Sequence, residues 1–233
     1  MPRCGWTRDR GRSPRCSGTR IPRGSPRSGS PICTPTSPSL GFARPGGAPT
    51  ADLLSAAYAF AFGGMTPAAP IPVYAPQDCA RRLAGFLGRA DVGFLKGVFD
   101  FRALYEGHDV RHWNLRLTAR AVAHDTEAYG LRAERQGSVL AYSGDSGPCA
   151  ALGELALRAD LFLCEADITE HRDGEQVHLT PEDAGRIARE ARVRELAVTH
   201  VGPRLTREEA TARAAAVFGR PTHTAVEGAT RTV

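Results

Sequence analysis

After residue 51, some segments of the chain alternate hydrophobic and polar positions as strands do, and others have the spacing of helices. Residues 115–122 place Leu and Ala at every second position, which predicts a half-buried strand. The continuous apolar run at 161–164 is typical of a strand buried on both faces. Gln136-Gly137 separates two short strand-like runs and predicts a hairpin turn. The strands expected on these grounds are 71–74, 115–122, 131–134, 138–142, 161–164 and 196–199.

Two helices are marked at their first turns by capping residues. Thr180 is followed by Pro at the first helical position and by Asp183 three residues on, and Thr206 is followed by Glu209 with the same spacing. Two further helices are expected over 51–62 and 77–87. Strands and helices alternate in the last third of the chain, after a hairpin-rich middle. The pattern therefore predicts an α/β fold with helices packed on the outer face of a sheet.

Composition divides the chain near residue 50. The first fifty residues contain nine Arg, one Asp and neither Lys nor Glu, and nearly half of them are Pro, Gly or Ser. The other residues hold 21 basic and 24 acidic side chains, so the net charge of +5 belongs to the first segment. Because that segment has few large apolar side chains, we expect residues 1–50 to be disordered and residues 51–233 to form the folded domain. An alternative is that the basic segment binds RNA by neutralising phosphates.

Composition also argues against several classes of protein. No run of 18 apolar residues is present, which argues against a transmembrane helix. The Arg- and Pro-rich start lacks the apolar stretch of a secretory signal. Six Cys are scattered without a C-x-x-C pair, which is typical of reduced thiols rather than a disulfide framework or a zinc ribbon. We therefore expect a soluble, cytoplasmic protein that has no membrane partner.

Three polar residues, His124, Asp145 and His200, each come shortly after a predicted strand. Loops at strand ends are where a rigid sheet positions functional groups. Two imidazoles and a carboxylate suit zinc or manganese, so these residues are candidate metal ligands. The alternative for each is structural, because a histidine at a strand end is often part of the core and an aspartate between Ser and Gly can bond its own backbone.

Six segments form one pattern in letters and in spacing: Ile71–Pro76, His124–Gly130, Tyr142–Asp145, Leu163–Ala166, His178–Thr180 and Leu196–His200. With this pattern, the chain from residue 51 to its end resembles the C-terminal three-quarters of a metallo-β-lactamase-fold hydrolase. The branch that it resembles contains ribonuclease Z and its bacterial relatives. The resemblance implies an α/β protein with a four-layered αβ/βα sandwich and two metal ions, usually zinc, at one edge.

The resemblance assigns roles to residues at matching positions. It implies that His124 is a ligand of the first metal, that Asp145 bridges both metals and that His200 is a ligand of the second. His178 matches a histidine that assists the leaving group, and its alternative is a surface residue ahead of an N-cap. Glu165 is expected to orient a neighbouring ligand rather than to bind metal. The implied activity is metal-dependent hydrolysis of an ester or phosphodiester, RNA included, and family members often form homodimers.

The chain departs from the family at its signature. The motif His-x-His-x-Asp-His, expected just before residue 51, is absent, and no His precedes His108. We therefore expect an N-terminally incomplete domain with weak zinc binding and impaired hydrolysis. The alternative function is that of a non-catalytic remnant or dimer partner that retains the shell of the fold.

The codons of Pro31–Thr36 offer a cause for this absence. Read one base earlier, they can spell His-Leu-His-Ala-Asp, although Ser37 cannot then supply the final His. The hypothesis is that residues 1–50 are a shifted-frame translation of the true N-terminus, which accounts for their Arg, Pro, Gly and Ser bias. Sequencing the gene tests the hypothesis, and an uninterrupted reading frame contradicts it.

Overall fold

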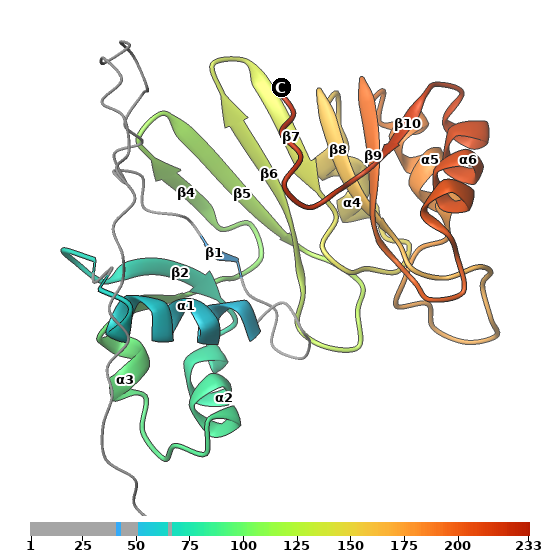
Figure 1. Cartoon of the computed structure of the whole chain (residues 1–233). Helices are drawn as coiled ribbons and strands as arrows, with labels where there is room; N and C mark the ends of the chain where they lie inside the picture. Colours follow the sequence, from blue (N-terminus) through green and yellow to red (C-terminus); the bar gives the residue numbers. More distant parts are fainter. Residues whose placement is uncertain (1–40, 43–50, 65–66) are drawn as a thin grey trace, which may run out of the picture. The chain divides into compact units, whose positions relative to one another are not determined.

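The computed structural model describes residues 41–42, 51–64 and 67–233 (Figure 1). Internal contacts divide the chain into residues 1–37 and 38–233, and every described residue belongs to the second unit. Within these ranges there are two sheets, one of three strands and one of seven. None of the helices in these ranges has the length and apolar character that spanning a bilayer requires.

The smaller sheet is parallel and contains β1 (Gly41–Phe42), β2 (Ile71–Ala75) and β3 (Phe99–Ala103). The helices of this part are α1 (Ala51–Phe62), α2 (Cys79–Phe86) and α3 (Gly93–Lys96). Apolar side chains from the helices and the strands share one buried cluster, which includes Leu54, Val73, Leu83, Leu95 and Phe99. Parallel strands need crossover connections, and these helices supply them.

The larger sheet keeps its strands in chain order, from β4 at one edge to β10 at the other. Its antiparallel part is a meander of β4 (Asp109–His112), β5 (Leu115–Ala121), β6 (Tyr129–Arg135) and β7 (Ser138–Tyr142). The strands parallel to β7 are β8 (Leu161–Ala166), β9 (Glu195–Val201) and β10 (Thr222–Thr224). The connections between them contain α4 (Ala150–Ala156), α5 (Pro181–Glu190) and α6 (Arg207–Phe218).

Strand direction decides where the ends of these strands lie. β5 is antiparallel to β6, and β6 is antiparallel to β7, so β5 runs in the same direction as β7, β8 and β9. The carboxyl ends of these four strands therefore lie at the same end of the sheet, across the strands rather than along its outer strands β4 and β10. Loops at the carboxyl ends of parallel strands are a common place for binding sites.

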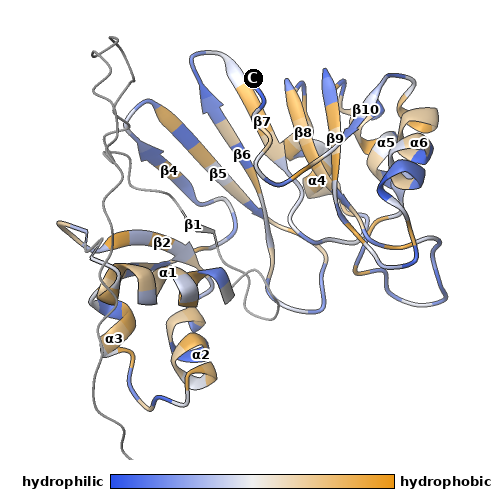
Figure 2. Cartoon of the chain, in the orientation of Figure 1, coloured by the Kyte–Doolittle hydropathy of each residue, from blue (hydrophilic) through white to orange (hydrophobic). Residues whose placement is uncertain are grey.

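The core of the larger sheet is formed by the parallel strands and their helices. Phe162, Leu196 and Val198 are fully buried in one cluster with apolar residues of α4, α5 and α6. Figure 2 shows the apolar character of β8 and β9 and the mixed character of β5. At the surface, Arg213 of α6 donates two hydrogen bonds to the carboxylate of Glu182 on α5, at 2.7 and 2.9 Å. The two last helices are thus joined by packing and by a bidentate ion pair.

Most elements expected from the sequence are present in the structure. Thr180 and Asp183 form a reciprocal capping box at the start of α5, and Thr206 caps α6 by accepting from the Glu209 N–H. Gln136 and Gly137 both have positive φ, 52° and 88°, as a two-residue type I′ hairpin turn requires. The elements that the sequence pattern did not predict are short: β1, α3, β3, β4, α4 and β10. Short elements carry too few residues to show a period.

Part of the first fifty residues enters the fold, because Gly41 and Phe42 form β1 beside β2. Residues 1–40 and 43–50 lie outside the described residues. Pro31–Thr36, on which the hypothesis of a shifted reading frame rests, lies there too. Disorder of the first segment and a domain boundary at residue 51 stay predictions.

Asp183 in the first turn of α5 is expected to contribute pH-dependent stability. Burial raises the pKa of this carboxyl, but hydrogen bonds from Thr180 and the charges of His171 and Arg186 outweigh burial and leave the pKa below its usual value. A folded-state pKa below the unfolded one gives stability that is complete above the unfolded pKa and is lost as the pH falls through the folded value. Asp183→Asn should therefore lower the free energy of unfolding by about 1 kcal/mol near pH 7. The difference should shrink below about pH 4. Urea unfolding across this range measures it, and a difference independent of pH contradicts it.

Candidate functional site

His124 lies just beyond the carboxyl end of β5. An isolated bridge pairs Ala123 with Gly147, and the Gly147 N–H donates to the Ala123 carbonyl oxygen at 2.6 Å. This bridge fixes the segment after β5 against the loop after β7. The Nδ1 atom of His124 lies 2.5 Å from Asp125 Oδ1 and 3.2 Å from Thr126 Oγ1. Because these contacts engage Nδ1, His124 would bind a metal through Nε2.

Asp145 lies in a tight loop after β7 that backbone hydrogen bonds tie to β8. The Ser143 N–H donates to the Leu163 carbonyl oxygen at 3.0 Å, and Ser143 Oγ accepts from the Glu165 N–H at 3.0 Å. The Ser146 N–H donates to Glu165 Oε1 at 2.7 Å. Asp145 is 3% exposed. A carboxylate buried this deeply is stabilised by a cation or by donors that face it.

Glu165 connects the loop after β7 with the segment after β8. Its fully buried carboxylate accepts three backbone N–H bonds, from Ser146 at 2.7 Å, Leu179 at 3.0 Å and Asp167 at 3.3 Å. Its Oε1 also lies 2.8 Å from Nδ1 of His178. A carboxylate that faces several N–H donors is satisfied in its ionised form. Glu165 therefore holds the His178 ring with a proton on Nδ1 and leaves Nε2 to face the site.

His178 stands two residues before Thr180, the N-cap of α5, and its ring lies close to His124, Asp145, Asp167 and His200. Its segment packs closely on the loop after β7, because a Cβ at Gly147 would lie 1.7 Å from the Gln176 carbonyl oxygen. The His178 ring meets the His124 ring edge-on, with 5.2 Å between ring centroids. It stacks on the His200 ring at 5.6 Å. Three histidines, two from connecting segments and one from β9, thus lie side by side.

His200 occupies a β-bulge near the end of β9. Glu165 pairs with Thr199 and Ala166 pairs with Val201, so His200 is the extra residue of its strand. Its φ is 46°, in the left-handed region that non-glycine residues seldom adopt. Bulges turn side chains to new directions beside functional sites. Here Nε2 of His200 lies 3.2 Å from Oδ2 of Asp145, so the structure brings these two predicted residues into direct contact.

Asp167 was not predicted as a site residue from the sequence, yet its carboxylate lies close to His178 and His200. Its Oδ1 lies 3.9 Å from His200 Nε2, and its Oδ2 lies 3.9 Å from His178 Nε2. Gly202 permits the approach, because a Cβ there would lie 2.1 Å from the Asp167 carbonyl oxygen. The signal that could have indicated Asp167 is its place directly after the buried strand β8, two residues beyond Glu165.

Two overlapping sets of side chains in the described residues could hold a metal ion. One is His124, Asp145 and His178, and the other is Asp167, His178 and His200. Within each set the three ligand atoms lie within 4.8 Å of one another. Ligand atoms around a tetrahedral zinc lie about 3.3 Å apart when the bonds are about 2.0 Å long. Small side-chain movements would therefore bring either set to coordinating distance, and the donor types fit zinc.

The remaining histidines lie outside these two sets. His171 is exposed and contacts Asp183 at 2.7 Å. His108, His112 and His223 are partly buried, and the His108 ring stacks on Tyr105 at 4.2 Å. Burial raises the pKa of the Cys164 thiol well above its usual value. This thiol therefore stays protonated and is not a thiolate ligand.

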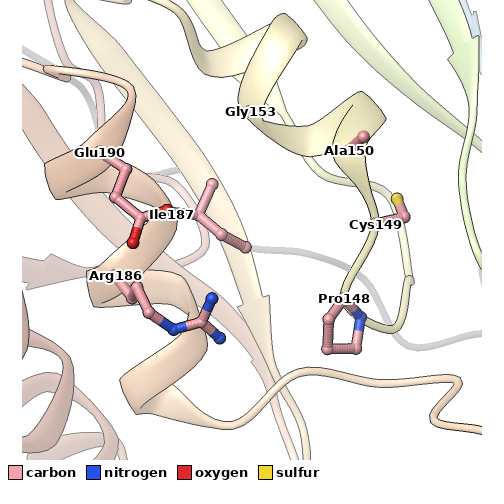
Figure 3. Close-up of a pocket in the computed structure, with 7 residues that line it drawn as sticks. All are labelled: Pro148, Cys149, Ala150, Gly153, Arg186, Ile187 and Glu190. Carbon is pink, nitrogen blue, oxygen red and sulfur yellow. The ribbon is translucent and has the colours of Figure 1, made fainter.

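A cavity of about 310 Å³ lies between the start of α4 and α5 (Figure 3). Cys149, expected to be buried, is only partly buried and lines it, and Arg186 and Glu190 of α5 face it from the other side. None of the histidines and aspartates of the candidate site lines this cavity. It is a separate feature of the surface.

Residues 53–201 match the beta-lactamase superfamily domain. An uncharacterised protein of Mycobacterium leprae is 41% identical over 162 residues, which are 68% of this chain and 57% of that protein. A ribonuclease Z of Lachnospira eligens is 33% identical over 122 residues, which are 48% of this chain and 40% of that enzyme. Among solved structures, the metallo-beta-lactamase fold protein YhfI of Bacillus subtilis has a TM-score of 0.62 at 22% identity, covering 75% of this chain and 70% of that one.

These matches confirm the fold and the ribonuclease Z-like resemblance that the sequence pattern predicts. The chain spans less than two thirds of the length of the first relative, 57% of that protein. The matched range 53–201 contains all five side chains of the two candidate metal sets. The chain therefore belongs to the metallo-β-lactamase superfamily.

Proposed function

We propose that this chain is a metal-dependent hydrolase that cleaves phosphodiester bonds. The observation that carries the proposal is the meeting of Asp145 with His200 at 3.2 Å, beside His124 and His178, at one edge of the sheet. We propose that the metal is zinc, with His124 and Asp145 as ligands of one ion and Asp145 and His200 as ligands of a second. A divalent ion bound there polarises the scissile group and lowers the pKa of a water molecule.

Asp145 supplies the negative charge of this ligand set. Its two oxygens allow it to serve two ions, whereas each histidine serves one. The loop that carries it is held by hydrogen bonds of neighbouring residues, including the bond from the Ser146 N–H to the Glu165 carboxylate. These bonds hold the loop before a cation binds, which is the preorganisation that a metal centre needs.

His178 donates the proton that the leaving oxygen requires. An alkoxide leaving group is strongly basic, so it departs more readily when a positioned acid protonates it. Glu165, 2.8 Å from Nδ1, stabilises the charged ring and fixes its orientation. The proton is then given from Nε2, on the side of the ring that faces the other site residues.

The surroundings of His200 suit an anionic substrate. A cavity of about 610 Å³ opens there, and His200, Arg207 and Glu227 are among the residues that line it. Arg207, the first residue of α6, brings a positive charge to this cavity and can pair with an anionic group. One matched relative is a ribonuclease Z, and we propose RNA as the phosphodiester substrate.

His178→Ala is expected to separate proton donation from metal binding. With zinc bound, cleavage of a phosphodiester that has an alkyl leaving group should slow by about 10² to 10³-fold. Cleavage of a p-nitrophenyl diester should slow far less, because that group departs without a proton. The matched control is Glu175→Ala, which shortens an exposed side chain of the same connection. Equal losses on both substrates would show that His178 is not the proton donor.

The missing histidine motif limits this activity. Without His-x-His-x-Asp-His in the sequence, each zinc has fewer protein ligands than the three or four that such sites use. We therefore propose weak zinc binding and slow hydrolysis by this chain. The second candidate function is that of a non-catalytic remnant or dimer partner. In that case this chain would pair with a chain that has the complete histidine motif. A chain that binds zinc but hydrolyses neither diester supports the second function and contradicts the first.

A further inference from the structure

We propose that Asp167, His178 and His200 form a separate site for one zinc ion, whose three ligands are Asp167 and two residues that follow it in the chain. This goes beyond the proposed function, in which Asp167 has no role and His178 carries a proton. The three side chains come from the end of β8, from the segment before α5 and from the bulge of β9. The missing histidine motif is therefore irrelevant to this site.

The carboxylate of Asp167 lies near the Nε2 atoms of both rings. One oxygen is 3.9 Å from His178 Nε2 and the other is 3.9 Å from His200 Nε2. Tetrahedral zinc places its ligand atoms about 3.3 Å apart, so closing each pair requires a shift of about half an ångström. The three side chains are 26%, 21% and 42% exposed, in the order Asp167, His178 and His200. An ion can therefore enter from solvent, and water can complete its coordination.

Each of the three ligands is held by a neighbour that does not bind the ion. Glu165 engages Nδ1 of His178, so the neutral ring presents the lone pair of Nε2, as in carboxylate–histidine–metal arrangements. The same carboxylate accepts from the Asp167 N–H at 3.3 Å. The bulge and the left-handed backbone set the direction of His200. The site is thus organised before the metal binds.

Occupation of this site has a consequence for the reaction. His178 Nε2 cannot bind zinc and carry a proton at once, and His200 Nε2 cannot serve two ions. Zinc held by Asp167, His178 and His200 therefore takes His178 out of proton donation. The ion bound in this way is inhibitory, and it defines a resting state of the chain.

Zinc affinity of the full chain, measured by competition with a chromophoric chelator, tests the proposal. Asp167→Asn should weaken zinc binding by about tenfold to a hundredfold, because the amide oxygen is a poor replacement for the carboxylate. It should also change the visible absorption of bound cobalt(II), which reports the ligand set. Asp173→Asn is the matched control, since it removes the same charge from an exposed position of the same connection. It should leave the affinity within about twofold.

His124→Gln separates this site from the metal set of the proposed function. If the zinc lies at Asp167, His178 and His200, this variant keeps the affinity of the unaltered chain. A loss in His124→Gln with none in Asp167→Asn overturns the new site and supports the proposed function. No loss in either variant overturns both. Circular dichroism of each variant shows whether a loss of affinity reflects the site or the fold.

Discussion

Asp145→Asn is expected to remove zinc-dependent hydrolysis almost completely. The substitution keeps the shape of the side chain but replaces a 3%-exposed carboxylate with a neutral amide, 3.2 Å from His200 Nε2. Charge stabilisation by a bound metal contributes several kcal/mol, so its loss corresponds to about a thousandfold in kcat/KM. Zinc affinity at this set should fall by about a hundredfold. Both quantities are measured on the full chain with a p-nitrophenyl diester and a zinc chelator.

The fold should survive this substitution, which makes the result interpretable. Ser143, Ser146 and Glu165 make hydrogen bonds that hold the loop and do not involve the Asp145 carboxylate. Circular dichroism and urea unfolding should therefore match the unaltered chain closely. Asp173→Asn serves again as the charge-matched control and should change neither quantity. If Asp145→Asn retains zinc-dependent hydrolysis, Asp145 is not a ligand of the reactive centre.

Glu165→Gln is expected to weaken both the fold and the site. The carboxylate accepts from the N–H groups of Ser146, Leu179 and Asp167 and faces His178 Nδ1. A glutamine has one acceptor oxygen, and its NH₂ group would point at buried donors. A buried donor that loses its acceptor costs about 1 to 3 kcal/mol. We expect the free energy of unfolding to fall by about 2 to 4 kcal/mol, measured by urea unfolding near neutral pH.

The same variant should lower zinc affinity by about tenfold to a hundredfold, because His178 loses the partner that fixes its ring. Glu175→Gln is the matched control, since Glu175 is exposed in the connection that leads to His178. Its effect on stability should stay within about 0.5 kcal/mol. An unchanged urea midpoint for Glu165→Gln would mean that the buried carboxylate is not the link between the two loops.

The sequence by itself determined the local elements and indicated three candidate site residues. The caps at Thr180 and Thr206 and the Gln136-Gly137 turn depend on interactions within a few residues, so their patterns are visible in the letters. His124, Asp145 and His200 are candidates because each comes shortly after a predicted strand, and the structure places His200 inside β9. The six matching segments also indicated the metallo-β-lactamase superfamily, and the comparisons confirm this membership.

Only the tertiary structure decided how these residues meet. The bulge that makes His200 the extra residue of β9 is a property of its pairing with β8, and no local period encodes a register shift. Asp167 can approach the site histidines because Gly202, which has no Cβ, leaves room for its backbone. Glu165 accepts hydrogen bonds from backbone segments that are distant in sequence. Contacts of this kind depend on the packing of whole loops. The sequence therefore indicates which residue types could form the site, whereas long-range packing sets which nitrogen and oxygen atoms face one another.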